Sequence, residues 1–485
     1  MALFAVDQDR VELAGQMTTG ILDVLIVGGG IVGSGIARDA AMRGLRVGLV
    51  EQNDLASGTS SRSSRLLHGG LRYLAQGRLG LVYEASREKR VLHRIAPHLG
   101  EPLPFLFPTY RGTRWPLWQL RIGVKLYDLL CGGRNLGPST SLSRADLTKV
   151  LPGIREEDLT GAVRYYDGLT NDARLVLDTL HSARHHGAMV LNYARLDRAK
   201  ANRDRWQCEV SDAMGGRQLT ISARSVVNAA GPWADGFPQS AIRLRTTKGV
   251  HLVVDRQRLP VPSAVVMTEG PRILFAIPWG ERVIIGTTDT DYDGPPQAVR
   301  TEAADVQYIL GVVNASFPAA KLSTADVLSC WAGLRPLIAD RRGRPSDISR
   351  RHVIQMAQLG WLDVAGGKLT TYRLIAEQAV DRLLRHLRQR AARCRTAEEP
   401  LRDAGGGCPY SGILPPVVGP EPVRYACRHE WAVHLDDVML RRTSWHYYHR
   451  DAAAIARQAA GWMAEVLGWD AARQHAELER YGAVE

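Results

Sequence analysis

Three glycines and an acid near the start of the chain have the spacing of a dinucleotide site. Gly28, Gly30 and Gly33 fall in the run GGGIVG, and Glu51 lies 18 residues after Gly33. In this pattern the first glycine makes a tight turn, the second lets the backbone approach a pyrophosphate, and the third allows close helix–strand packing. The N–H groups and dipole of a helix that begins there favour phosphate charge. Because Glu51 is placed to hydrogen-bond a ribose hydroxyl, we predict a dinucleotide site.

A second group of reactive side chains follows in the run LLHGGLRY, residues 66–73. Two glycines bring His68, Arg72 and Tyr73 together, soon after the first motif. Residues 53–65 precede them and are rich in serine, threonine and glycine, which is typical of a loop around a polar ligand, with an ordinary polar loop as the alternative. The hydroxyl residues that we expect at the ligand are Thr59, Ser60 and Ser61.

Further candidates lie in the middle of the chain. Gly231 ends a predicted apolar strand in the run SVVNAAGPWAD, where small residues let the backbone approach a nucleotide. His251 follows in the run KGVH. Arg335 stands in GLRPL, which we interpret as a tight turn, and Arg350 lies 15 residues on.

A late glycine pair repeats the opening theme. Gly366 and Gly367 separate a predicted strand from a predicted helix that runs to about residue 389. The residues at the start of that helix are Lys368, Leu369 and Thr370. A helix that starts here would aim its positive end at whatever the first motif holds.

The elements around these residues predict an α/β chain with antiparallel strands between its parallel parts. Residues 24–27 and 47–50 are short apolar runs typical of buried parallel strands, and Gly44 ends the helix between them. Residues 187–226 alternate as strands with a turn at 215–216, and 273–288 predict a hairpin. Helices are predicted at 79–96 and 171–185.

A chain of 485 residues is too long for one ordinary core. We interpret residues 1–19 as a loose extension and 20–394 as one interleaved unit that holds the motifs above. Residues 395–422 carry a glycine triplet and several prolines and predict a linker, and 423–485 predict a small all-helical domain.

Composition narrows the class of protein. The net charge is +12, but the arginines are spread over many elements, so we interpret them as surface charge and expect no nucleic-acid partner. The six cysteines form no CxxC pair, and no His/Cys cluster has the spacing of a metal site, so free thiols in a reducing compartment fit best. We expect no signal peptide and no membrane-spanning helix.

Residues 114–130 predict an amphipathic basic helix. The apolar positions are Trp115, Trp118, Leu120, Ile122, Leu126 and Leu129. Three basic residues stand among them, which keeps a membrane-interface helix open. We expect a helix whose apolar residues face the core.

By these motifs the chain resembles the FAD-dependent glycerol-3-phosphate dehydrogenases of the respiratory, quinone-linked type. The resemblance runs in order over residues 20–445 and has one departure in a motif, Val250 where the family has serine in KGSH. The matching runs are VGGGIVGSGIARDAAMRGLRV, TSSRSSRLLHGGLRYL, YYDGLTNDARLV, VVNAAGPWAD, KGVHLVV, IPWGERVIIGTTDTDY, GLRPL, AGGKLTTYR and HEWAVHLDDVMLRRT.

The resemblance implies a fold, a cofactor and partners. The fold is α/β, with a Rossmann-like FAD-binding domain of the glutathione-reductase type interleaved with an antiparallel β-sheet substrate domain and followed by a C-terminal helical domain. The cofactor is FAD, and the reaction is oxidation of sn-glycerol 3-phosphate to dihydroxyacetone phosphate by hydride transfer from C2 to flavin N5. A membrane quinone takes the electrons, which implies a cytoplasmic protein on the inner face of the membrane. A homodimer stays open.

The same resemblance suggests roles for the candidate residues. His68 is the first choice for the base, because an imidazole titrates near working pH, and His251 is the second. Arginine's planar fork suits phosphate, so Arg335 and Arg350 are chosen for the substrate phosphate, with Arg72 and Lys368 assisting. Lys368 and the helix after it would stabilise the anionic reduced flavin, and the Tyr73 side chain would line the substrate pocket.

Several alternatives stay open at this point. The substrate could be another polyol phosphate such as erythritol 4-phosphate, and the acceptor could be oxygen. A flavin-binding regulator without catalysis fits poorly, because it needs no base beside the flavin. A nicotinamide dehydrogenase would fit the first motif alone, but the second glycine turn and the long interleaved chain favour FAD.

Overall fold

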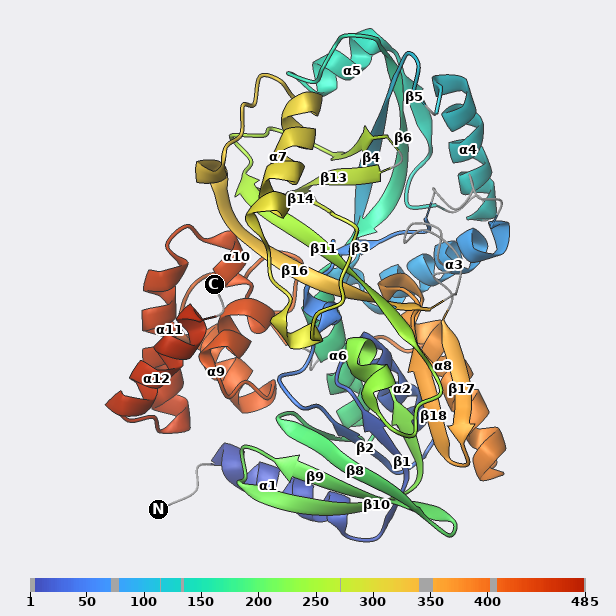
Figure 1. Cartoon of the computed structure of the whole chain (residues 1–485), viewed down its shortest axis with the longest axis vertical. Coiled ribbons are helices and arrows are strands. Elements are labelled where there is room, and N and C mark those ends of the chain that lie inside the picture. The colour runs from blue at the N-terminus through green and yellow to red at the C-terminus, as the bar shows by residue number, and fades with distance from the viewer. Residues whose placement is uncertain are drawn as a thin grey trace.

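The computed structural model describes residues 5–70, 78–113, 115–131, 135–270, 272–339, 352–401 and 408–483. Within them the chain forms two sheets, stacked along the long axis of the molecule, and a group of C-terminal helices at one side (Figure 1). We name the sheets by their places in Figure 1, so that the lower sheet contains the first motif.

The lower sheet is mainly parallel. Its strands, in spatial order, are β17 (Val353–Gln358), β18 (Trp361–Ala365), β10 (Arg217–Asn228), β1 (Ile21–Val27), β2 (Val47–Val50) and β7 (Met189–Leu191), while β9 (Arg205–Asp212) and β8 (Ala194–Asn202) extend from β10 as an antiparallel meander. Five neighbouring strands from β18 to β7 are parallel. All of β2 is buried, as its continuous apolar run predicted.

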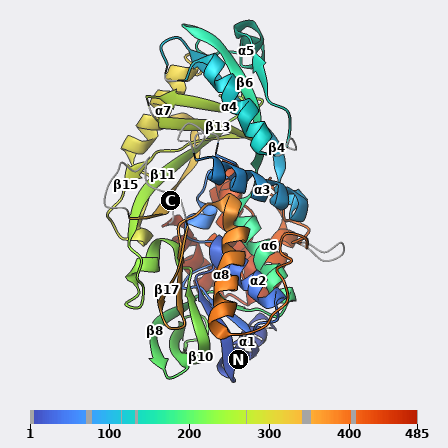
Figure 2. The same ribbon diagram turned by 90° about the vertical axis from the view of Figure 1, so that its right-hand side faces the viewer.

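Helices cover one face of this sheet. They are α2 (Ile31–Met42), α6 (Asp172–His185) and α8 (Tyr372–Leu387), which share one apolar core with β1 and β2 (Figure 2). The small residues of α2 allow close packing, because a Cβ on Gly35 would lie only 2.9 Å from the Tyr372 ring. The predicted helix and strand positions of this unit are confirmed.

The N-terminal segment is not a loose extension, so that interpretation was wrong. Residues 5–18 form α1 (Ala5–Thr18), whose Ala14 and Met17 are fully buried against the opposite face of the lower sheet. Arg10 donates to the Asp212 carboxylate at 2.7 Å and to the Asn192 carbonyl at 2.6 Å. Only a few apolar residues pack α1 against the sheet, and its ion pair is made with a strand about 200 residues away. The local sequence pattern therefore gave little indication of a packed helix.

The upper sheet is mainly antiparallel. Its strands, in spatial order, are β15 (Thr290–Asp291), β11 (Leu244–Asp255), β14 (Arg282–Gly286), β13 (Arg272–Trp279), β12 (Ala264–Glu269), β4 (Glu101–Tyr110), β6 (Leu159–Leu169) and β3 (Leu66–Leu67), with β16 (Val327–Ile338) beside β11 and β5 (Thr140–Leu142) beside β6. The helices around it are α3 (Leu79–Ile95), α4 (Leu117–Leu130), α5 (Arg144–Val150) and α7 (Ala303–Ser316). The chain passes between the sheets four times, which confirms the predicted interleaving.

Two expectations about the upper part were wrong. Arg335 lies within strand β16 and not in a tight turn, because β16 pairs with β11 along its whole length. The neighbouring Pro336 is tolerated since β16 is an edge strand with β11 as its described partner. The second error concerns α4, where four of the six apolar residues expected to face the core are exposed: Trp118, Ile122, Leu126 and Leu129.

The C-terminal part is helical, as predicted. It contains α9 (Pro420–His429), a π-helical turn η8 (Asp437–Arg442), α10 (Trp445–Tyr448), α11 (Ala452–Leu467) and α12 (Ala471–Gly482). These elements have a core of their own, which includes the fully buried Trp445 and Met463. The described parts of 395–419 contain no regular helix or strand, which fits the linker predicted for 395–422 except that α9 begins at its last residues, 420–422.

Candidate functional site

The first glycine motif forms the turn between β1 and α2. Gly28 has φ +113°, and a Cβ there would lie 2.5 Å from the Ala229 carbonyl oxygen of the neighbouring segment. A Cβ on Gly33 would lie 2.0 Å from the Gly28 carbonyl oxygen. Since both positions exclude a side chain, the turn and the helix pack as the spacing predicted.

The N-terminus of α2 is presented at this turn. Gly30 is the N-cap, and it has no side chain to satisfy the first N–H groups of the helix. The Ser60 hydroxyl accepts a hydrogen bond from the Ile31 N–H at 3.0 Å, which places one predicted loop serine at the helix end. Helix N-termini favour anions, so this place suits a phosphate.

Glu51 lies where β2 ends. Its carboxylate accepts hydrogen bonds from the Gly29 N–H at 2.7 Å and from the Asn53 N–H at 2.9 Å. Burial raises the pKa of Glu51, and these two N–H groups oppose that rise. The carboxylate is therefore fixed beside the glycine turn, with oxygen lone pairs left for a ribose hydroxyl.

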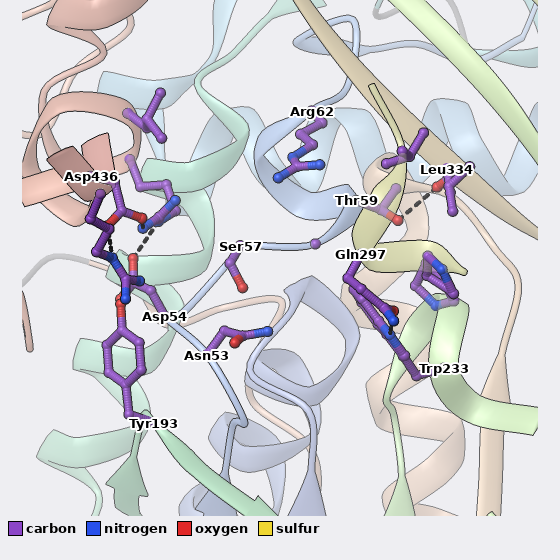
Figure 3. A pocket seen from close by; sticks show the side chains of 17 residues that line it. Asn53, Asp54, Ser57, Thr59, Arg62, Tyr193, Trp233, Gln297, Leu334 and Asp436 are labelled. Carbon is purple, nitrogen blue, oxygen red and sulfur yellow. Dashed lines mark hydrogen bonds and ion pairs between the residues drawn. The ribbon is translucent and has the colours of Figure 1, made fainter. Parts of the chain in front are cut away.

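The loop after Glu51 is tied to the upper sheet. Thr59 donates from its hydroxyl to the Leu334 carbonyl on β16 at 2.7 Å, and Ser61 is buried. A pocket of about 190 Å³ opens beside the loop, between Ser57 and the facing Trp233 (Figure 3). Gly231, two residues before that tryptophan, has no atom within 4 Å of where a Cβ would be. The loop and Gly231 thus border open space next to the glycine turn.

The two segments expected at the reaction centre lie together. The His68 N–H donates to the Thr370 hydroxyl at 3.1 Å, and that hydroxyl lies 3.2 Å from the His68 carbonyl oxygen. His68 directly follows β3, and Thr370 lies in the short helical turn η7 (Leu369–Thr371). Residues about 300 positions apart are therefore joined at one point, as the candidate site requires.

The late glycine turn leads into η7 and then α8. Gly366 and Gly367 have φ of +74° and +87°, and a Cβ on Gly367 would lie 2.4 Å from the Ile375 side chain. Lys368 is the N-cap of η7, and Leu369 begins it. Full α-helix starts only at Tyr372, a few residues later than the sequence predicted.

The Gly69 N–H is held by two residues for which the sequence had predicted no role. Its N–H lies 3.0 Å from the Tyr127 hydroxyl and 3.2 Å from the Asp167 carboxylate. Lys89 forms a buried ion pair with Asp167 at 2.7 Å. The motif YYDGL contained Asp167, but nothing in the local pattern linked it to Lys89 on α3 or Tyr127 on α4.

Arg335 is held on the upper sheet by short polar contacts. Its guanidinium donates to the Thr287 hydroxyl at 3.0 Å and to the Asp289 carboxylate at 3.1 Å. It lies over Gly249, where a Cβ would be 2.5 Å from the guanidinium nitrogen Nη2. The planar cation is thus fixed in a partly buried position that suits a phosphate.

His251 is buried beside Arg335. Its Nε2 lies 2.7 Å from the Ser64 hydroxyl, its ring stacks on Trp331 at 5.2 Å, and its Nδ1 has no hydrogen-bond partner among the described residues. Burial, with help from Arg335 and Arg65, lowers the pKa of His251 to about 3. This side chain is neutral near pH 7 and is a weak base, which favours His68 of the two candidates.

Three predicted residues cannot be placed. Arg72, Tyr73 and Arg350 lie outside the residues that the structure describes.

A buried charge cluster joins the C-terminal helices to the loop after β2. Arg441 and Arg442, both in η8, form ion pairs with Asp54, and Arg442 donates to one of its oxygens at 2.8 Å. Burial alone would raise the pKa of Asp54, but Arg442 and Arg441 outweigh it and hold that pKa below its ordinary value. The run DDVMLRRT carried these arginines without any sign of their partner.

Comparison with known proteins gives the class of this site. Residues 23–373 match a family described as FAD-dependent oxidoreductases, and 415–474 match the C-terminal domain of alpha-glycerophosphate oxidase. The chain belongs to the FAD-dependent oxidoreductase family. FAD is the cofactor of this oxidoreductase.

Its relatives carry consistent names. "Glycerol-3-phosphate dehydrogenase 2" of Mycobacterium bovis is 37% identical, over 96% of this chain and 88% of that protein. "Aerobic glycerol-3-phosphate dehydrogenase" of Staphylococcus epidermidis is 38% identical, over 76% and 68%. The solved glycerol-3-phosphate dehydrogenase of Bacillus halodurans, complexed with FAD, is 29% identical, with a TM-score of 0.79 over 98% of this chain and 96% of that one.

The observed residues fit FAD. The turn at Gly28 and Gly33 excludes side chains, the helix end at Gly30 has no side-chain cap, which suits a pyrophosphate, and Glu51 is fixed beside this turn, where the sequence predicts a ribose contact. Open space lies over Gly231. The prediction for the residues that would hold the cofactor stays as made from the sequence: Gly28, Gly30, Gly33, Glu51, Thr59, Ser60, Ser61, Gly231, Gly366, Gly367, Lys368, Leu369 and Thr370.

Proposed function

We propose that this oxidoreductase converts sn-glycerol 3-phosphate to dihydroxyacetone phosphate and passes the electrons to a quinone. FAD, when bound, supplies the acceptor for the hydride from C2 at its N5. The names of the relatives support the substrate. The observation that carries the proposal is the two-way contact between His68 and Thr370, because it joins a base and a cofactor turn at one point.

The proposed roles follow from chemistry and position. His68 takes the proton of the C2 hydroxyl through its imidazole. Arg335 binds the substrate phosphate through its fork, which first releases the Asp289 carboxylate. Lys368, at the late glycine turn, adds positive charge beside the cofactor.

The remaining residues keep supporting roles in this proposal. Arg72, Arg350 and Tyr73 complete the phosphate and substrate contacts. His251 acts as a neutral support for Ser64, because its low pKa makes it a poor base.

An anaerobic titration tests this function. The purified yellow protein is mixed with glycerol 3-phosphate, erythritol 4-phosphate and glycerol, and the flavin absorbance is followed by stopped flow. We expect glycerol 3-phosphate to bleach the flavin fastest. Faster bleaching by erythritol 4-phosphate would change the substrate, and no bleaching by any of them would overturn the proposal.

Oxygen is the second candidate for the electron acceptor. The match of residues 415–474 to a domain of alpha-glycerophosphate oxidase favours testing it. Turnover under air with a peroxide assay, compared with turnover on a soluble quinone, separates the two. Stoichiometric peroxide would make the protein an oxidase, while quinone reduction with little peroxide supports the dehydrogenase.

Quinone use implies contact with the inner face of the cell membrane. Among the described residues, no helix is long and apolar enough to cross a bilayer. We therefore propose a peripheral attachment, on the cytoplasmic side.

A further inference from the structure

Helix α4 turns a row of large apolar side chains to solvent. Trp118, Ile122, Leu126 and Leu129 are 65%, 62%, 36% and 71% exposed. At 100° per residue these four fall within about 80° of one side of the helix. The opposite side carries Leu120, Val124 and Tyr127, all buried.

The neighbouring α3 also exposes large apolar side chains. Leu79 and Tyr83, one helical turn apart, are 45% and 52% exposed. The two helices share one core, in which Val82 of α3 and Val124 of α4 are buried, and they lie next to each other on one side of the molecule (Figure 2). Of the thirteen large apolar side chains that the described residues leave exposed, six lie on these two helices. We name this surface, formed by Leu79, Tyr83, Trp118, Ile122, Leu126 and Leu129, the α3/α4 face.

The charges on these helices have one sign. Every charged residue of the exposed class on α3 and α4 is basic, and these are Arg87, Arg94, Arg121 and Lys125. The acids are partly or fully buried: Asp128 accepts from Asn135 and Ser139, and Glu88 forms an ion pair with Arg373. Glu84 is partly buried. Arg121 and Lys125 lie on the helix surface next to the apolar row.

We propose that the α3/α4 face docks on an anionic lipid bilayer. Aliphatic residues with a tryptophan and a tyrosine on one side, bordered by basic residues, have the chemistry of a helix that lies in the membrane interface. Several large apolar side chains exposed on one side of a helix mark an interaction surface, and the basic border favours a partner with negative charge. The net charge of +12 acts in the same direction.

The face is also close to the reaction centre. On the inner side of α4, the Tyr127 hydroxyl holds the Gly69 N–H at 3.0 Å, directly after His68. A helix is about 10 Å across, so the docked surface lies roughly one helix diameter from this turn. This inference rests on the proposed quinone acceptor, because it gives that acceptor a short route from the bilayer.

The test compares holoenzyme variants on vesicles. The double variant Ile122→Glu/Leu129→Glu places acids in the α3/α4 face, and Leu359→Glu/Val417→Glu places them at residues that are 78% and 89% exposed elsewhere. Flotation with vesicles of phosphatidylglycerol and phosphatidylcholine measures binding. We expect the first variant to bind on the order of a hundredfold more weakly, since two aliphatic side chains no longer enter the interface. The second variant should bind like the wild type, and pure phosphatidylcholine should bind all forms less.

Each outcome decides between separate claims. Glycerol 3-phosphate oxidation with a soluble dye should be equal in all forms, while quinone reduction in vesicles should fall only for the face variant. Wild-type flotation by the face variant, or equal loss in the control variant, overturns the docking face. If the wild type reduces the dye but does not bind vesicles, the docking proposal is refuted and the proposed function stands. If it binds vesicles but does not reduce the dye, the docking proposal stands and the proposed function is refuted.

A second copy of this chain could cover the α3/α4 face instead of lipid, and light scattering would detect the resulting dimer. A wild-type dimer that the face variant converts to monomer, without lipid binding by the wild type, would assign the surface to a second copy of the chain. That result would also overturn the proposal. Thermal unfolding of both variants checks that the exposed substitutions leave the fold intact.

Discussion

The lower and upper sheets hold their parts of the site by different means. At the lower sheet the cofactor turn depends on the backbone, because Gly28 and Gly33 exclude side chains and Glu51 binds N–H groups. At the upper sheet, charged side chains hold one another, as Arg335 does with Asp289 and Lys89 with Asp167. A site made by backbone geometry leaves a fixed spacing in the sequence, while one made by distant side chains does not.

The largest effect should come from Gly33→Val, which disrupts the backbone turn at the lower sheet. A Cβ there would lie 2.0 Å from the Gly28 carbonyl oxygen, so the turn must open. We expect a colourless protein without bound FAD, measured by absorbance after purification. Gly311→Ala, in α7 with no atom within 4 Å, is the control and should keep the yellow colour. A yellow Gly33→Val protein would contradict the argument.

Asp54→Ala tests whether the structure around the lower sheet also depends on buried charge. The change leaves Arg441 and Arg442 buried without their shared partner. Breaking such a buried cluster costs about 3–5 kcal/mol, so we expect a large fall in the free energy of unfolding by urea. The exposed pair of Arg144 and Glu156 supplies the control, and Glu156→Ala should cost under about 1 kcal/mol. Equal costs would mean that the C-terminal helices are held by other contacts.

Arg335→Ala tests whether the site at the upper sheet depends on a charged side chain. The variant loses a charged hydrogen-bond pair to the substrate phosphate, which should cost about 2–3 kcal/mol of transition-state stabilisation. We therefore expect kcat/KM to fall roughly 30- to 150-fold. Arg335→Lys should recover part of it, and glycerol, which has no phosphate, should lose little. Steady-state kinetics with a soluble dye give the values. Near-normal turnover of glycerol 3-phosphate would remove Arg335 from the site.

The smallest expected effect is the pH dependence that His251 adds. Its pKa in the folded protein, about 3 because of burial, lies below the ordinary 6.5, so the folded state binds fewer protons. The part of the free energy of unfolding that depends on a neutral His251 is present above pH 6.5 and is lost as the pH falls below that value. Between pH 7 and pH 5 the loss is about 2 kcal/mol.

His251→Asn should flatten that part of the curve in chemical unfolding. The substitution His475→Gln, at a side chain that is 76% exposed, should leave the curve as it is. Parallel curves for wild type and His251→Asn would show that the burial of this imidazole does not control acid stability.

What the sequence predicted follows the same division. The interleaved fold, the glycine turns and the meeting of the His68 and Thr370 segments were predicted, because each depends on local runs of small or apolar residues. The helix α1, the strand around Arg335 and the partners of Asp54 were missed, since ion pairs or strand pairing over long sequence separations decide them. For α4 the period predicted a helix, but apolar residues on both sides left its orientation open.

Interleaving limits how this protein can be divided. Because the polypeptide leaves each sheet and returns, the two sheets must assemble together, and no continuous fragment contains one complete sheet without strands of the other. A protease cut or a recombination joint in that region would leave strands without their neighbours. The helices from α9 on have a core of their own, but exchanging them would also leave Asp54 buried without Arg441 and Arg442, so any replacement must supply those two cations.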